Sequence, residues 1–136
     1  MAAKHVNAKT VARDRYGIYW EKAQEFMETM VDAAVKRNWN AVGLAGVHSV
    51  ICATDALLVK YAGVRSSADS HQDVVGLLRG RIQDAEMPRQ CKRLSEILAQ
   101  KNLIEYIDRS YPEKEALALK LSVERYLAWV TKIINA

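Results

Sequence analysis

The sequence predicts an all-α protein, an antiparallel up-and-down helical bundle of four long helices and one short helix. Two observations lead to this fold class. Only six glycines and two prolines occur in 136 residues, half of which are hydrophobic, and such a composition favours helices over strands and tight turns. Apolar residues recur at spacings of three and four along five segments, and no segment alternates as a strand does. We expect a flexible N-terminus at residues 1–10 and a single domain at 11–136.

The first two predicted helices span residues 11–37 and 41–61. The first is amphipathic, whereas the second is almost uncharged, so we expect the second to be the central and most buried helix. Asn38 and Asn40 are expected to cap its N-terminus, and Gly63 its C-terminus. Small side chains on this helix would let another backbone approach closely, and we expect them to support self-association: Gly43, Gly46, Ser49 and Ala53.

The last three predicted helices follow a polar segment at residues 64–69. A short helix begins at Ser70, with Asp73 in the capping position, and ends near Gly80. The fourth begins at Pro88 and continues to about residue 108, and the fifth begins at Pro112. Short connections favour antiparallel neighbours, with the short helix laid across one end of the bundle.

Composition narrows the functional classes. The N-terminus has no apolar signal segment, and no run approaches the length that spans a bilayer. Cys52 and Cys91 have no partner at the spacing of a metal finger, so we expect free thiols in a cytoplasmic protein that holds no metal and no cofactor. The net charge of +4 favours acidic partners without requiring a nucleic acid.

The second and third helices carry the residues of a family resemblance. Residues 40–49 read NAVGLAGVHS, residues 55–58 read DALL, and residues 70–78 read SHQDVVGLL. Further on, residues 106–111 read YIDRSY before a helix rich in Ala and Leu. This pattern resembles the HEPN domain, the higher eukaryotes and prokaryotes nucleotide-binding family, over most of the chain.

The resemblance implies a five-helix bundle that usually dimerises and is often encoded with a small nucleotidyltransferase, in pairs that resemble toxin and antitoxin. Some members are metal-independent ribonucleases that use an Arg and a His a few residues apart, and here five residues separate Arg65 from His71. Active members usually carry Asn, Asp or His after that Arg, whereas this chain has Ser66. The resemblance therefore implies binding more than cleavage.

Arg65 and His71 have the side chains that RNA cleavage needs. A His of near-neutral pKa can take the proton of a 2′-hydroxyl group, while an Arg stabilises the charge that grows on the phosphate. The alternative interpretation is structural, with Arg65 solvated in a loop and His71 in the first turn of a helix. We expect the structural interpretation.

Three polar residues share one face of the second helix: His48, Cys52 and Asp55. They could form part of a metal site, but a buried His with a hydrogen-bond partner is the better interpretation in so apolar a helix. We expect Asp55 to reach solvent or to pair with a cation such as Arg79 or Arg125.

The densest basic patch could contact phosphates or an acidic protein surface, or could be solvated helix ends. We therefore expect a non-catalytic HEPN-like binding module, either homodimeric or paired with a nucleotidyltransferase, and associated with a nucleotide or RNA. The alternatives are a ribonuclease toxin that uses Arg65 and His71, and a structural helical adaptor. The expected binding residues are Arg79, Arg81, Arg89, Lys92 and Arg93.

Overall fold

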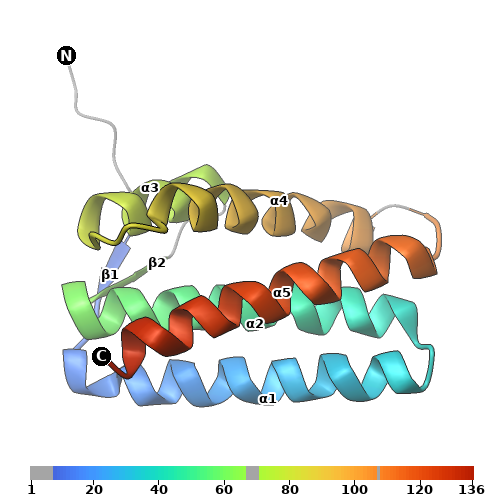
Figure 1. Cartoon of the computed structure of the whole chain (residues 1–136), viewed down its shortest axis with the longest axis horizontal. Coiled ribbons are helices and arrows are strands. Elements are labelled where there is room, and N and C mark those ends of the chain that lie inside the picture. Colours follow the sequence, from blue (N-terminus) through green and yellow to red (C-terminus); the bar gives the residue numbers. More distant parts are fainter. Residues whose placement is uncertain (1–7, 67–70, 107) are drawn as a thin grey trace.

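The computed structural model describes residues 8–66, 71–106 and 108–136, without the side chains of residues 71 and 72. Its described residues form an antiparallel helical bundle, which confirms the predicted fold class (Figure 1). Helices α1 and α4 run away from the end where the two short strands lie, and α2 and α5 return toward it. The short helix α3 packs on α4, α2 and β2. The bounds are α1 Tyr16–Val35, α2 Trp39–Ala62, α3 His71–Arg81, α4 Met87–Tyr106 and α5 Glu113–Ile134.

A two-stranded antiparallel sheet is the feature that the sequence did not predict. Strand β1, Ala8–Thr10, pairs with β2, Val64–Ser66, so that Lys9 lies opposite Arg65. The expectation of no strand was wrong here, and the strand begins within the residues 1–10 that were expected to be flexible. A strand of three residues is too short to show an alternating pattern in the sequence. Its pairing is also hard to predict, because the two strands lie far apart in the chain.

Helix α2 is the centre of the molecule, as predicted, and packs on every other α-helix. Its small residues face helices of the same chain. A Cβ atom on Gly43 would lie 2.8 Å from Ile104 Cδ1, and one on Gly46 would lie 3.0 Å from Met30 Sδ. The buried Ser49 hydroxyl donates a hydrogen bond of 2.9 Å to the Ala23 carbonyl in α1. These small residues therefore serve packing within the chain, and self-association stays a prediction.

The ends of α2 agree only in part with the sequence. Gly63 adopts a left-handed conformation with φ of 64° and donates its N–H to the Val59 carbonyl at 3.1 Å, which confirms the predicted C-cap. Asn38 makes no side-chain capping bond. Asn40 Oδ1 instead accepts the Tyr111 N–H at 2.7 Å, so it joins the start of α2 to the segment that precedes α5. The predicted cap of α3 at Ser70 lies outside the described residues.

Length and composition alone would let α2 cross a membrane, contrary to the expectation that no run is long enough. In the bundle, 78% of its most apolar window is buried. A mostly buried apolar helix is what the core of a soluble protein contains.

Candidate anion-binding groove

The bundle separates the five basic residues that the sequence grouped. Arg89 and Arg93 line a groove between α4 and α5. Arg81 lines a neighbouring pocket, and Lys92 is exposed on α4 outside the lining of either. Arg79 lies beside the Cys91 thiol, whose pKa is raised by burial and lowered in part by that guanidinium. The predicted patch is therefore divided between a groove and a pocket, and Arg79 and Lys92 lie outside both.

The groove has an accessible volume of about 380 Å³ and four cationic side chains. Two of the four, Arg125 and Lys132, were not assigned to a binding site from the sequence, because they lie on α5, far along the chain from Arg89 and Arg93. Their helical spacing is the signal that could have found them, since residues 125, 128, 129 and 132 share one face of a helix. The lining residues are Glu86, Arg89, Gln90, Arg93, Arg125, Ala128, Trp129 and Lys132.

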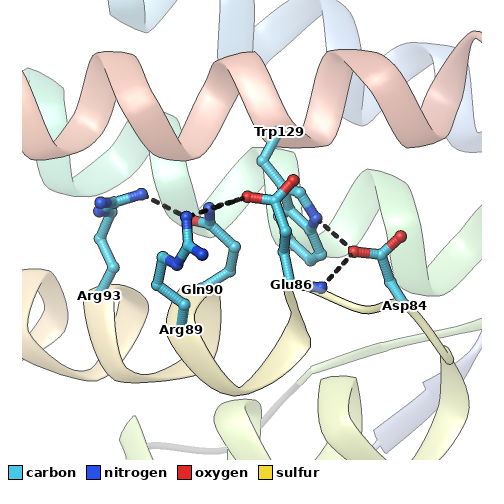
Figure 2. A network of polar contacts seen from close by, with 6 residues as sticks. All are labelled: Asp84, Glu86, Arg89, Gln90, Arg93 and Trp129. Atoms are coloured by element: carbon cyan, nitrogen blue, oxygen red, sulfur yellow. Dashed lines mark hydrogen bonds and ion pairs between the residues drawn. The ribbon is translucent and has the colours of Figure 1, made fainter.

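A chain of polar contacts runs along the α4 side of the groove (Figure 2). Arg93 Nη1 donates a hydrogen bond of 3.0 Å to Gln90 Oε1. Gln90 Nε2 donates one of 3.4 Å to Glu86 Oε1, which also lies 3.7 Å from Arg89 Nη1. Gln90 is only 2% exposed, so its amide is fixed, whereas the Arg89 side chain is 71% exposed.

Asp84 lies beside the groove and bonds to two of the residues that line it, Trp129 and Glu86. Its Oδ2 atom accepts hydrogen bonds of 2.9 Å from both the Trp129 indole N–H and the Glu86 backbone N–H. These two bonds, the Trp129 bond first, hold the pKa of Asp84 below its ordinary value. Trp129 is buried, so its ring presents no face for stacking against a base.

The residues that line the groove are rich in donors that can bind an anion. The lining contains no Cys, Ser, Thr, Tyr or His, and its one carboxylate, Glu86, contacts Gln90 and Arg89. Exposed guanidinium groups bind phosphates and carboxylates.

A second pocket of about 450 Å³ adjoins the groove and shares Lys132 with it. Arg81 adds a further cation there, and Tyr61, Ile82 and Ile133 form its apolar wall. Asp84 also lines this pocket, so its cations face a carboxylate.

Arg65 and Asp55 lie together at the small sheet. Arg65 is half-buried on β2 and donates a hydrogen bond of 3.3 Å to the Ser66 carbonyl. His71 begins α3, but its side chain is not among those that the structure describes, so only Arg65 of the alternative catalytic pair is placed. Asp55 Oδ1 accepts the Ser66 N–H at 3.1 Å, and burial raises the pKa of Asp55 to about 6 despite that bond and the Arg65 charge. The expected cations were wrong: Arg65 supplies the charge, whereas Arg79 and Arg125 lie elsewhere.

His48 is not the buried histidine that the sequence predicted. Its side chain is 39% exposed, with Nε2 at 3.7 Å from Glu105 Oε1 and its ring centroid at 5.7 Å from that of Phe26. Cys52 is half-buried, and burial and the Asp55 charge raise the pKa of its thiol. Among the described residues, no group of three or more His, Cys, Asp or Glu side chains is arranged to hold a metal ion.

An apolar hollow of about 580 Å³ lies between the start of α2 and the end of α4, where His48 sits. Leu44 lines it and is 42% exposed, and Phe26 on α1 is 37% exposed beside His48. These side chains form one partly apolar face: Phe26, Leu44, His48, Ile104 and Glu105.

Comparisons with protein-family models, curated protein sequences and solved structures gave no match for this chain.

Proposed function

We propose that this chain is a non-catalytic, HEPN-like binding module that holds the phosphate backbone of RNA in the groove between α4 and α5. The observation that supports this function is the convergence of four cations from two helices on one groove with a single carboxylate. Cations in that arrangement raise the local concentration of a polyanion and contact its phosphates.

The spread of the cations favours a chain of phosphates over a single one. Arg89 and Arg93 are four residues apart on α4, or about 6 Å along the helix axis. Arg125 and Lys132 are seven residues apart on α5, or about 10 Å. Cations spread over that length can contact successive phosphates, so a polyanion can use more of the groove than a small ion does.

The buried tryptophan favours contact with the backbone and not with the bases. Proteins that read single strands expose aromatic faces on which bases stack. Trp129 is 3% exposed, and its N–H is already bonded to Asp84. We therefore expect binding that depends strongly on salt and little on RNA sequence.

Fluorescence anisotropy with a labelled single-stranded RNA tests this function. Arg89→Gln combined with Arg93→Gln should weaken binding by about tenfold or more and flatten the salt dependence, with the slope of log K against log salt falling by about 0.7 per lost cation. Lys36→Gln combined with Lys114→Gln is the matched control, because both lysines are exposed and lie at the opposite end of the bundle. Equal weakening in both double variants, or no binding by the wild type, would contradict the proposal.

The ribonuclease alternative is tested on the same RNA without metal ions. We expect the RNA to stay intact. Cleavage that is lost in both Arg65→Ala and His71→Ala would establish the catalytic alternative, because each change removes a group that the reaction needs.

We also propose that the chain self-associates through the partly apolar face of α1, α2 and α4. Exposed apolar side chains that gather on one face mark protein interfaces, and here Phe26 and Leu44 flank the hollow. The Glu105 carboxylate of this face lies 3.7 Å from His48 Nε2 and 3.9 Å from Lys101 Nζ. A second copy can therefore approach without strong repulsion between like charges.

Sedimentation equilibrium tests the self-association. Leu44→Glu should shift the protein from dimer toward monomer at a protein concentration on the order of tens of micromolar. A dimer with a stable interface stays associated at that concentration. Leu121→Glu on α5 is the control, since that leucine is similarly exposed at 47%. A monomeric wild type would favour the structural adaptor, or a different partner such as a nucleotidyltransferase, over the homodimer.

A further inference from the structure

Glu86 places a negative charge inside the proposed phosphate groove. This inference rests on the proposed function and concerns the regulation of the same site. We propose that the Glu86 carboxylate is an internal competitor that an incoming phosphate displaces, and that Gln90 is the positioning residue that holds Arg93 and Glu86 in place for this exchange.

The Glu86 carboxylate occupies the donors that a phosphate oxygen would use. Its Oε1 atom lies 3.4 Å from Gln90 Nε2 and 3.7 Å from Arg89 Nη1. Arginine binds carboxylate and phosphate through the same N–H groups. The Glu86–Arg89 pair is well exposed, with 35% and 71% of the two side chains accessible, and exposed ion pairs are weak. A phosphate can therefore replace the carboxylate at little cost.

Gln90 has a chemically fixed orientation. Arginine has only donors, so the amide oxygen of Gln90 must face Arg93, as the 3.0 Å contact has it. The amide N–H₂ group then faces Glu86. When the Glu86 side chain leaves, this buried donor loses its partner, and an unpaired buried donor favours any oxygen that can replace it. The phosphate takes that place.

Only the side chain of Glu86 needs to move in the exchange. Its backbone N–H donates to Asp84 Oδ2 at 2.9 Å, and its carbonyl accepts the Gln90 N–H at 2.9 Å. Asp84 does not compete in the same way, because its Oδ2 atom is held by Trp129 as well. The turn before α4 therefore keeps its backbone geometry while the carboxylate rotates away.

The RNA anisotropy assay tests the exchange through Glu86→Gln. We expect this variant to bind about threefold to tenfold more tightly with an unchanged salt slope, because Arg89 contacts a phosphate in both proteins and only the competing carboxylate is removed. Glu96→Gln is the matched control. It removes the same charge from an exposed position on α4, outside the groove. Equal effects of the two variants would show a general charge effect and overturn the exchange while leaving RNA binding intact.

A second pair of variants tests Gln90 as a positioning residue. In a Gln90→Leu background, Arg93→Gln should weaken binding much less than it does in the wild type, because Arg93 has already lost the contact that aims it. Circular dichroism verifies that Gln90→Leu is folded. Additive effects of the two changes would overturn the positioning role. Absence of RNA binding in the wild type is a different result, which removes the proposed function itself.

Discussion

Asp55 shows how burial and hydrogen bonding compete at a single residue. The carboxylate is 8% exposed in the most apolar helix, and its charged form is supported by the Ser66 N–H and by the Arg65 charge. Burial outweighs both and raises its pKa to about 6. The raised pKa lowers the stability of the folded protein at neutral pH. The hydrogen bond to Ser66 nevertheless joins α2 to β2 and so anchors the small sheet.

We predict that Asp55→Asn stabilises the protein, and clearly more at pH 7.5 than near pH 4.5. The folded-state pKa of about 6 lies above the ordinary value of 3.8, so the stability present below pH 3.8 is lost as the pH rises through about 6. An asparagine avoids that loss, up to about 3 kcal/mol, and its amide oxygen can still accept the Ser66 N–H. Urea unfolding of both proteins at the two pH values measures the difference. A difference that does not change with pH would contradict the raised pKa.

At the scale of elements, the glycines of α2 and α3 serve different purposes. Gly43 lets α2 approach Ile104 at the end of α4 and the buried Tyr111, which lie 2.8 and 2.9 Å from an added Cβ atom. Gly76 in α3 has no atom within 4 Å of such a Cβ. Glycine lowers helix stability in both places, but only Gly43 gains close packing from it.

We predict opposite effects of alanine at these two glycines. Gly76→Ala should raise the free energy of unfolding by about 0.5–1 kcal/mol, because it improves helix propensity without a clash. Gly43→Ala gains the same propensity but must displace the Tyr111 ring, and overpacking of that kind costs about 1–3 kcal/mol. Its net effect should therefore be destabilising. Urea unfolding midpoints measure both, and a stabilising Gly43→Ala would show that the α2–α4 contact is looser than its geometry indicates.

At the scale of the whole molecule, α2 links all the α-helices into one cooperative unit. It packs on α1, α3, α4 and α5, and the Thr54 and Tyr126 hydroxyl groups bond at 2.6 Å between α2 and α5. Each of the other α-helices in the described part of the chain packs on α2. Loss of any one of them therefore exposes the apolar core that α2 supplies.

We predict a single two-state unfolding transition. Three tryptophans report on different helices: Trp20 on α1, Trp39 on α2 and Trp129 on α5. Variants that keep one tryptophan, with the other two replaced by Phe, should unfold at the same urea concentration by fluorescence as by far-ultraviolet circular dichroism. An earlier transition at Trp20 would show that α1 leaves before the rest of the bundle.

The helices themselves follow from local properties of the sequence. Their existence, order and approximate bounds come from apolar spacing and from residues such as Gly63 and Pro112, because a helix is stabilised by contacts three and four residues apart. The central position of α2 follows in the same way from its lack of charges. These features are local, so one sequence is enough to predict them.

The groove and the sheet depend on which distant residues meet, and only the tertiary structure decided that. Arg125 and Lys132 join Arg89 and Arg93 because α5 returns antiparallel to α4, whereas Arg79 turns toward Cys91. The Asp55–Ser66 hydrogen bond and the β1–β2 pairing likewise join separate elements, and helical periodicity in the sequence does not predict such contacts. The sequence by itself determined which helices form and which one is central. The packing of those helices decided which charges share a surface, because side chains far apart in the chain are brought together only by the fold.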